Sequence, residues 1–297
     1  MIPLYFPEPV LNSRMDMPIA FTKMEGLGND YIYVNVLECP IDDPAAFSRR
    51  WSDRRKGVGS DGLILIGGSD VADFSMRIFN ADGSEGRMCG NGARCVGRYI
   101  HDKGLSPKTT LTLETLSGIK TLELELDGNG SVKAVTVGMG PGVPLEVCLP
   151  DGGRDTLIQC PVSALGHTWT GTAIDMGNPH LVLSVPDPEA LNLPEIGPVL
   201  EHDSRFPDRV NVEFVRVLSP TLIRMRVWER GSGITAACGT GACASAVAMA
   251  MAGLTRPEGC TVRMDGGDLS VRWDPETKEV WMKGPAETVF EGTILND

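Results

Sequence analysis

Two cysteines stand in the same local sequence in the two halves of the chain. Cys89 opens the run CGNGARC, and Cys238 opens the run CGTGACA. Turn-forming residues precede each cysteine and an apolar, helix-like pattern follows it, so each thiol is expected at or just before the first turn of a helix. The peptide dipole at a helix N-terminus lowers a thiol pKa from about 8.5 towards neutrality. Both cysteines are therefore predicted to exchange protons near neutral pH.

The glycines that follow each cysteine favour an anion site. Gly90 and Gly239 come directly after the thiols, and glycine lets a ligand approach the free N–H groups of a helix start. Two acid/base groups of one type suit the inversion of a carbon centre, because one group removes a proton from one face while the other delivers a proton to the opposite face. The helix N–H groups would bind a carboxylate beside the reacting carbon and stabilise the charge that develops there.

The remaining cysteines and the histidines point to no metal centre. Cys95 and Cys243 lie inside the expected helices and are assigned to packing. The chain has eight cysteines but no CxxC pair, and its four histidines lack zinc-ligand spacing. We therefore expect reduced thiols and no metal site.

Polar residues in glycine-rich loops form a second group of candidates. An asparagine in such a loop is commonly a turn former, and a Glu-Arg pair is commonly solvated. Arg230, however, directly precedes the second cysteine loop, where a guanidinium can hold a carboxylate through two hydrogen bonds. Asn211 interrupts a strand-like run, in which asparagine is disfavoured. The group comprises Asn29, Asn80, Asn91, Asn178, His180, Asn211, Glu229 and Arg230.

The composition excludes several classes of protein. The chain has 297 residues and a net charge of −12, which makes nucleic acid an improbable partner because phosphate backbones require clustered Lys and Arg. No apolar run approaches membrane-spanning length. Residues 1–18 contain prolines at several positions and lack the basic segment of a signal peptide, so we interpret them as a flexible extension without chemistry.

The repeated cysteine motif predicts a duplicated architecture. We expect an α/β (α+β) fold of two pseudo-symmetric domains, each a mixed or antiparallel sheet wrapped around a central helix. Residues 138–144 contain two Pro and three Gly, a composition that should not sustain a strand ladder and marks the domain boundary. Residues 19–140 then form the N-terminal domain, and residues 141–284 form the C-terminal domain. The expected strands include residues 19–25, 30–37, 63–66, 74–79, 132–137, 156–160, 181–185, 210–218 and 222–228.

A dinucleotide site is the competing interpretation of the second motif. GTGACA matches the GxGxxA pattern, but in such sites a strand turns directly into the glycines. Here the long loop 229–237 lies between the expected strand and Gly239. The pattern also leaves the repetition of the cysteine unexplained.

The motifs resemble those of the diaminopimelate epimerase family. FTKMEGLGNDYIYVN, GVGSDGLILI, FNADGSEGRMCGNGARC, MGNPHLV, RVNVEF and VWERGSGITAACGTGACA stand in the family's usual order, from Phe21 to the C-terminus. The resemblance implies a cofactor-independent epimerase that interconverts LL- and meso-2,6-diaminopimelate in lysine and peptidoglycan precursor synthesis. It also implies a cytoplasmic homodimer whose last strand, within residues 285–297, returns to the N-terminal domain.

The resemblance assigns a role to each candidate residue. Cys89 and Cys238 would be the acid/base pair, supported by His180 and Glu229. The residues that would bind substrate are Asn29, Asn80, Gly90, Asn91, Asn178, Asn211, Glu229, Arg230, Gly239 and Thr240.

Some residues depart from the family pattern. Glu25 stands where His or Asn is frequent, Gly62 where some members have Gln, and Ile234 where Glu commonly precedes Thr235.

Two other functions remain as alternatives. A proline or 4-hydroxyproline racemase shares the paired cysteines but usually carries His where Asn91 stands here, and its substrate has no distal group for Arg230. A non-catalytic binding protein of the same fold would be favoured by loss of either cysteine, and both are present.

Overall fold

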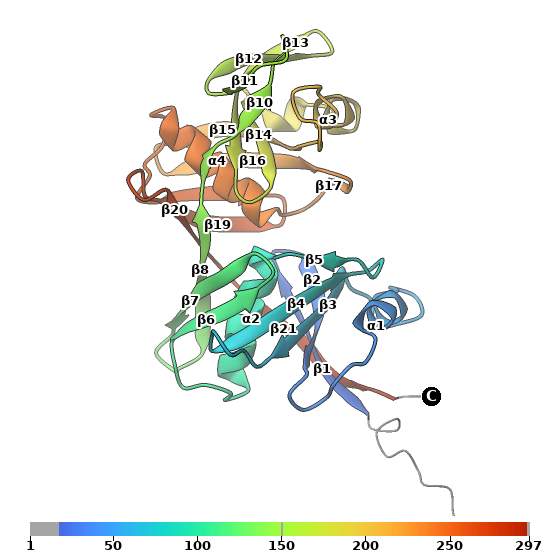
Figure 1. Ribbon diagram of the computed structural model, residues 1–297. Helices are drawn as coiled ribbons and strands as arrows, with labels where there is room; N and C mark the ends of the chain where they lie inside the picture. Colours follow the sequence, from blue (N-terminus) through green and yellow to red (C-terminus); the bar gives the residue numbers. More distant parts are fainter. Residues whose placement is uncertain (1–17, 150, 296–297) are drawn as a thin grey trace, which may run out of the picture.

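The chain forms two similar halves, each with a mixed sheet around one central helix (Figure 1). The structure is a computed structural model that describes residues 18–149 and 151–295. The expected α/β fold class is confirmed. The expected flexible extension at residues 1–18 lies outside the described residues, apart from Pro18.

In the N-terminal half as the structure describes it, groups of two or three strands precede, separate and follow two helices. They are β1 (Ile19–Gly26), β2 (Asn29–Asn35), α1 (Pro44–Trp51), β3 (Gly62–Gly67), β4 (Phe74–Asn80), β5 (Glu85–Gly86), α2 (Gly90–Asp102), β6 (Thr110–Thr115), β7 (Gly118–Leu126) and β8 (Val132–Pro141). The turn between β1 and β2 forms the expected hairpin. Leu27 and Gly28 both have positive φ angles, of 61° and 81°, as a two-residue hairpin turn requires.

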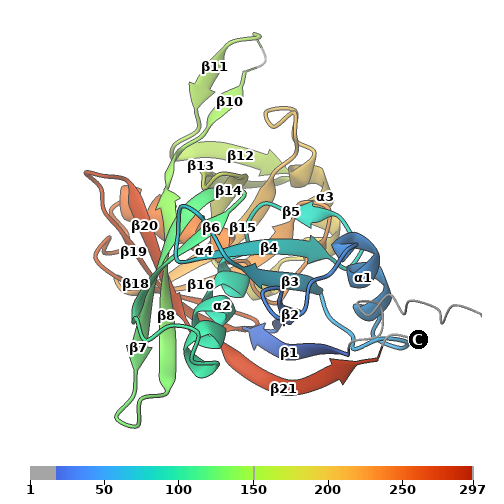
Figure 2. The same cartoon turned by 60° about the horizontal axis from the view of Figure 1, so that its bottom comes forward.

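The second half repeats this order after a protruding hairpin. Its elements are β9 (Val143–Pro144), β10 (Glu146–Cys148), β11 (Arg154–Thr156), β12 (Cys160–Ala164), β13 (His167–Asp175), β14 (Pro179–Ser184), the 3₁₀ turn η1 (Pro188–Ala190), α3 (Leu193–Glu201), β15 (Asn211–Ser219), β16 (Leu222–Glu229), β17 (Gly233–Ile234), α4 (Gly239–Met251), β18 (Cys260–Met264), β19 (Gly267–Trp273), β20 (Glu279–Gly284) and β21 (Glu287–Ile294). Figure 2 shows β10 and β11 projecting from the rest of the molecule.

Strand pairing confirms that the halves are built alike. In the N-terminal half β2 pairs with β3 and β4 with β6 in parallel, while β1–β2 and β3–β4 are antiparallel. In the C-terminal half β14 pairs with β15 and β16 with β18 in parallel, while β13–β14 and β15–β16 are antiparallel. Residues at equivalent positions of these strands therefore lie in equivalent places relative to the two central helices.

Each central helix is enclosed, and most of the residues that it buries are apolar or small. Four of the ten buried residues of α4 are alanine and the others are small or apolar, and a helix that is apolar on all sides is stable only inside a core. In α2, Gly97 lies against Val135 and Leu122, and a Cβ there would meet Val135 at 3.2 Å. Both helices belong to one continuous core cluster. Their N-terminal ends are consequently fixed by the packing of the whole core.

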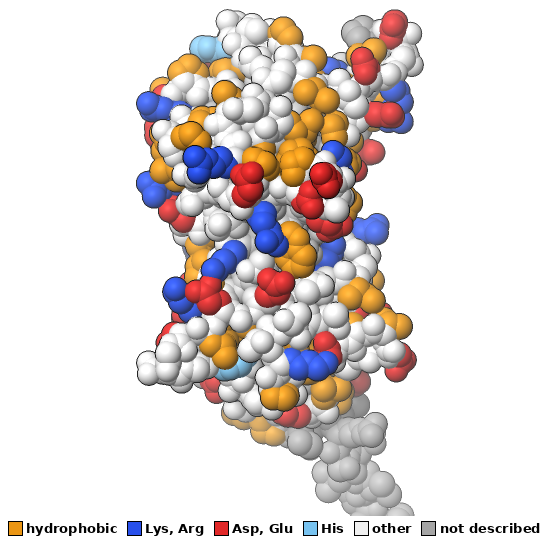
Figure 3. Space-filling model, turned by 90° about the vertical axis from the view of Figure 1, so that its left-hand side faces the viewer, with side chains coloured by type: hydrophobic (Ala, Val, Ile, Leu, Met, Phe, Trp, Pro, Cys, Tyr) orange, Lys and Arg blue, Asp and Glu red, His pale blue; other side chains and the backbone are white. Residues whose placement is uncertain are grey.

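Two chain crossings join the halves. β8 pairs with β20, and β21 pairs with β1, so the end of the described chain lies in the sheet of the N-terminal half (Figure 2). We propose residues 19–140 with 285–297, and residues 141–284, as the two domains. Figure 3 shows them as two masses with a narrower waist and with charges of both signs interspersed on this face.

The expectation that residues 138–144 could not sustain a ladder was wrong. β8 runs through Gly138 and Gly140 to Pro141, paired with Trp281, Val280 and Glu279 of β20. A register shift between Val280 and Trp281 accommodates Gly140, whose φ is 89°. A Cβ on Gly142 would meet three core side chains at 2.9–3.0 Å. The glycines therefore serve close packing at the crossing.

The strand expected at residues 156–160 was also misplaced. The structure has β11 ending at Thr156 and β12 beginning at Cys160. Gln159 between them has a φ of 52°, a left-handed conformation that interrupts an extended strand.

Candidate active site

Cys89 is the N-cap residue of α2. Its backbone is extended, with a φ of −135°, and its Sγ accepts a hydrogen bond from the Gly92 N–H at 3.3 Å. The thiol donates to Asn29 Oδ1 at 3.3 Å. The local sequence explains this geometry, because glycines after an N-cap leave its side chain room to fold over the first turn. The expected place of Cys89 at a helix start is confirmed.

Cys238 has the same role at the start of α4. Its φ is −127°, and Sγ accepts from the Gly241 N–H at 3.4 Å. Thr240 Oγ1 lies 3.6 Å from the sulfur. The two thiols thus have equivalent environments at their own helix starts and different neighbours beyond them.

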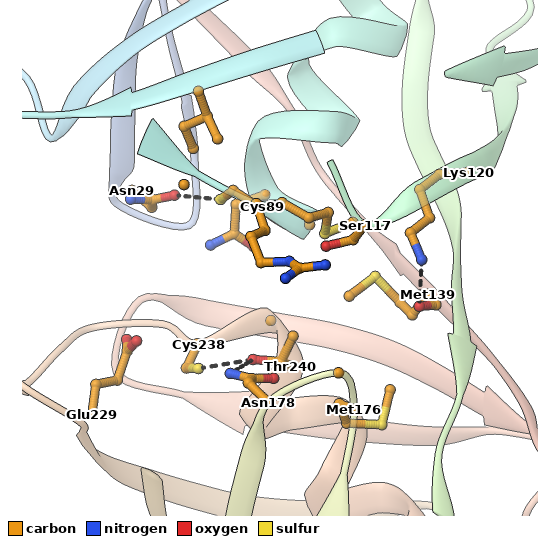
Figure 4. Close-up of a pocket in the computed structure, with 18 of the residues that line it drawn as sticks. Asn29, Cys89, Ser117, Lys120, Met139, Met176, Asn178, Glu229, Cys238 and Thr240 are labelled. Atoms are coloured by element: carbon orange, nitrogen blue, oxygen red, sulfur yellow. Dashed lines mark hydrogen bonds between the residues drawn. The ribbon is translucent and has the colours of Figure 1, made fainter. Parts of the chain in front are cut away.

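A cavity of about 660 Å³ separates the two helix starts. Figure 4 shows Cys89 on the wall formed by the N-terminal half and Cys238 on the facing wall. The cavity is also lined by most of the other residues singled out from the sequence. These are Asn29, Asn80, Gly90, Asn91, Asn178, Glu229, Arg230, Gly239 and Thr240.

His180 and Asn211 stand behind the cavity wall. The ring of His180 has no exposed surface, and its Nε2 lies 3.1 Å from Asn178 Oδ1. Asn211 donates to Pro179 O at 3.0 Å and accepts from the Arg230 N–H at 3.0 Å. Each of these two residues therefore reaches the cavity through a neighbour, Asn178 or Arg230, that lines it.

A buried carboxylate that is not among the candidates from the sequence lies beneath Cys238. Glu213 is completely buried, and its Oε1 lies 2.6 Å from His180 Nδ1. A Cβ added to Gly241 would lie 2.7 Å from the same oxygen. Glu213 belongs to the run RVNVEF, but a strand pattern gives no sign that one of its charged residues faces inward.

The expected lowering of the two thiol pKa values was wrong. Burial raises the pKa of Cys89, although the Gly92 N–H and the Arg94 guanidinium oppose the increase. Burial also raises the pKa of Cys238 well above its ordinary value, and the carboxylates of Glu229 and Glu213 add to that increase. The cost of ionising a thiol inside the protein thus exceeds the stabilisation from the helix N-terminus.

Glu229 shares this enclosed environment. Burial raises the pKa of its carboxyl, and the Thr235 hydroxyl, which donates to Oε1, opposes the shift. Glu229 lines the cavity beside Cys238 (Figure 4). The Glu229 carboxylate in turn raises the pKa of the second cysteine.

Asn29 is oriented by a residue from the second glycine-rich loop. Its Nδ2 donates to Asp61 Oδ2 at 2.8 Å, and Arg54 holds the other oxygen of Asp61 at 2.9 Å. The Asn29 amide therefore presents Oδ1 to Cys89. The pattern GVGSDG indicates only a loop, so the role of Asp61 was missed.

Several lining residues come from segments without any motif. Lys120 of β7 donates to Met139 O at 3.0 Å, and Ser117 lies near it (Figure 4). Burial lowers the pKa of Lys120. Tyr31 and Arg87, which belong to two of the quoted motifs, and Asp175 also line the cavity. Only the tertiary fold brings Ser117 and Lys120 to the cysteines, so no sequence signal could have identified these two residues.

Cys95 and Cys243, which were assigned to packing, lie in the main core cluster. Cys95 and Cys243 have no exposed surface, and burial raises the pKa of each to about 12. Within residues 18–149 and 151–295, no three His, Cys, Asp or Glu side chains gather as a metal site requires. None of the helices in that part of the chain is long and apolar enough to cross a membrane.

The three residues that depart from the family pattern lie at or near the site. Glu25 accepts from the Gly28 N–H at 2.8 Å, and so supports the turn before Asn29. Ile234 is exposed in β17. A Cβ on Gly62 would lie 2.1 Å from Phe79 O, so this backbone has no room for a larger side chain.

Comparison with known proteins places this geometry in a family. The family model described as "Diaminopimelate epimerase" matches residues 21–144 and 172–289. Diaminopimelate epimerase of Phocaeicola vulgatus is 54% identical over 285 residues, with 94% of this chain and 99% of that protein covered. Diaminopimelate epimerase of Parabacteroides distasonis is 53% identical over 280 residues, with 94% and 99% covered.

A solved structure shows the same fold at low identity. The crystal structure of a Bacillus anthracis phenazine biosynthesis protein of the PhzF family has a TM-score of 0.68 and 17% identity, with 94% of this chain and 99% of that chain covered. At this identity the likeness concerns the fold alone.

Proposed function

The chain belongs to the diaminopimelate epimerase family, and we propose that it interconverts LL- and meso-2,6-diaminopimelate by proton exchange between Cys89, Cys238 and one α-carbon. It is an amino-acid epimerase, and the reaction would serve lysine and peptidoglycan precursor synthesis. In each direction one thiolate removes the α-proton while the other thiol protonates the opposite face.

One observation carries this proposal. Two cysteines, each the N-cap of a central helix, line facing walls of one cavity. A substrate carbon between them would have one sulfur on each face. The free N–H groups at both helix starts would bind its carboxylate and stabilise the carbanion as it forms.

The surrounding polar residues suit a substrate with two amino acid ends. We propose that Gly90, Asn91, Gly239 and Thr240 hold the reacting carboxylate, since they form the two helix starts. The distal amino and carboxylate groups would contact Asn29, Asn80, Asn178, Glu229 and Arg230. His180 and Asn211 would act through Asn178 and Arg230, which they contact.

Proton NMR in deuterated water tests the reaction and the substrate together. Purified protein without added cofactor is incubated with LL-diaminopimelate and, separately, with L-proline. We expect deuterium at the α-position of diaminopimelate and the appearance of the meso isomer. Exchange into proline alone would assign the chain to the racemase alternative, and exchange into neither substrate would contradict the proposal.

The raised thiol pKa values predict the pH dependence of the rate. One cysteine must ionise to act as a base, and burial raises the pKa of both above the ordinary value. Below that pKa the thiolate fraction grows about tenfold per pH unit, so kcat/KM should increase with a slope near +1 between about pH 6 and 8. Initial rates across this range check the prediction, and a flat profile would show that a thiolate already exists at pH 6.

The quaternary structure and cellular location remain proposals. We propose a cytoplasmic homodimer, as the resemblance to the family implies, without membrane partners. The acidic net charge of −12 also argues against a nucleic acid partner. Sedimentation equilibrium of the purified chain would distinguish a dimer from a monomer.

A further inference from the structure

Arg94 is a completely buried cation close to Cys89. It lies in the second turn of α2, and its side chain has no exposed surface. Nε donates to Pro285 O at 2.9 Å and Nη1 donates to Asn91 Oδ1 at 2.9 Å, whereas Nη2 has no hydrogen-bond partner. Among residues 18–149 and 151–295, no carboxylate forms an ion pair with the Arg94 guanidinium within 4.0 Å. A buried guanidinium without a carboxylate is costly, which suggests that an anion forms near it during function.

Arg94 also determines how Asn91 faces the cavity. Because the guanidinium occupies Oδ1 of Asn91, the amide group is left with Nδ2 as its donor for a ligand. The guanidinium itself packs closely against two glycines and has little freedom. A Cβ on Gly26 would lie only 3.0 Å from Nη2, and a Cβ on Gly284 only 3.1 Å from Nε. Arg94 is therefore held in one place beneath the first turn of α2.

The pseudo-symmetry of the fold shows that the other half lacks this cation. Cys89 and Cys238 are equivalent N-caps, so Arg94 corresponds to Cys243, five residues after its own N-cap. Cys243 is neutral in the core, where burial raises its pKa to about 12. The position equivalent to Arg94 thus carries no cation in the second half.

The strand beneath each helix start also differs in charge, and here the charge is negative and lies in the second half. Tyr31 pairs with Gly62 across β2–β3, and His180 pairs with Asn211 across β14–β15, so Ile64 and Glu213 occupy equivalent places. The contacts agree: a Cβ on Gly92 would meet Ile64 Cδ1 at 2.5 Å, and a Cβ on Gly241 would meet Glu213 Oε1 at 2.7 Å. A hydrocarbon supports the first helix start where a carboxylate paired with His180 supports the second.

We propose that Arg94 polarises the cysteine pair, so that in the resting enzyme Cys89 is the first thiol to ionise and Cys238 keeps its proton. This inference rests on the proposed two-cysteine reaction and makes Arg94 a positioning residue, since it acts through Cys89 and Asn91. The asymmetry would decide which cysteine acts as base when a substrate first arrives.

The charged groups near the two thiols differ in the sense that the proposal requires, because a cation acts on Cys89 and carboxylates act on Cys238. Cys89 is faced by Arg94 of its own helix, which lowers its pKa, and by Glu229 from the opposite half, which raises it. Tyr31, Tyr33 and Cys95 are further titratable groups that interact with it, and burial raises the pKa of all three. Asn29 accepts from the neutral thiol, so that bond is lost on ionisation.

The neighbours of Cys238 act in the other direction. Glu229 and Glu213 both raise its pKa, and His180 is paired with Glu213. Thr240 Oγ1 lowers it. Arg230 and Lys120 are further cations that line the same cavity.

Alkylation by iodoacetamide in the absence of substrate tests the polarity directly. Only the thiolate attacks the iodoacetamide carbon and displaces iodide, so the rate at each cysteine follows its ionised fraction. Peptide mass spectrometry gives the pH midpoint for each cysteine separately. Comparing midpoints instead of rates removes the effect of access, because Cys238 is more buried than Cys89. We expect the midpoint of Cys89 to lie below that of Cys238, and the reverse order would overturn the proposal.

Arg94→Met removes the charge but keeps an unbranched side chain. We expect the Cys89 midpoint to rise by about one pH unit or more, a tenfold loss of thiolate at neutral pH, while the Cys238 midpoint stays within about 0.3 units. Arg98→Met is the matched control, because Arg98 is on the same helix and likewise bonds a backbone carbonyl, that of Ala286, but its side-chain partners are Asp102 and Glu287 and not Asn91. An unshifted Cys89 midpoint in a folded Arg94→Met protein would refute the proposal.

Arg94→Lys separates the charge from the hydrogen bonds. A lysine keeps the cation but cannot hold Asn91 and Pro285 together, so the Cys89 midpoint should stay within about half a unit while KM rises several-fold. If Arg94→Met does not fold, this variant and the order of midpoints in the native enzyme still decide the matter. These measurements use no diaminopimelate except for KM, so a failure of the proposed substrate would leave the test of the polarity intact.

Discussion

Replacing either Cys89 or Cys238 with alanine is expected to lower the rate of epimerisation by about 10³-fold or more. A positioned acid or base typically contributes about 10²–10⁴-fold, and inversion needs both groups because a single sulfur serves only one face of the carbon. The fold should persist, since each sulfur accepts only one backbone N–H bond as an N-cap, a contribution of about 1 kcal/mol.

The same NMR assay measures this prediction, with thermal unfolding as a check on structure. Cys39→Ala is the matched control, because Cys39 is a partly buried free thiol that does not line the cavity. It should retain the native rate. Near-normal turnover by folded Cys89→Ala would refute the two-cysteine mechanism.

Gly241→Ala is expected to reduce kcat by about 10–100-fold, a larger effect than the equivalent change at Gly92. The new Cβ would lie 2.7 Å from Glu213 Oε1 and 3.2 Å from the Cys238 sulfur. Glu213 is completely buried and held by His180, so it has little freedom to move. Overpacking of this kind costs about 1–3 kcal/mol, and here the displaced atoms include a reacting one.

Gly92→Ala provides the comparison. Its Cβ would meet Ile64 Cδ1 at 2.5 Å, but this atom ends an aliphatic side chain that carries no charge and no hydrogen bond to lose. Steady-state kinetics on both variants, together with their melting temperatures, give the result. Equal losses at the two glycines would show that the Glu213–His180 pair does not determine the effect.

The local features of the site could be predicted from the sequence because they depend on neighbouring residues. An N-cap bond joins Cys89 to Gly92 and Cys238 to Gly241, only three residues away, so the local pattern of residues indicates it. The hairpin before Asn29 likewise follows from its two turn residues. The identities of most candidate side chains therefore follow from short stretches of the chain.

The errors concern features that depend on packing. Residues 138–144 were expected to break the sheet, but they form a paired crossing because β20 supplies the partner strand and the core demands glycine there. The thiol pKa values were expected to fall, whereas enclosure by the two halves raises both. Neither the partner strand nor the burial can be deduced from the residues around Gly140 or Cys89.

The sequence by itself determined the two cysteine helix starts, the duplication and the family, because these are written in contiguous motifs. Only the tertiary structure decided that Cys89 and Cys238 face one cavity, that Lys120 joins them, and that His180 stands behind the wall. It alone placed a cation beneath one thiol and a carboxylate beneath the other. The physical reason is that burial and electrostatic interaction depend on distances in space, and segments far apart in the chain supply the nearest neighbours.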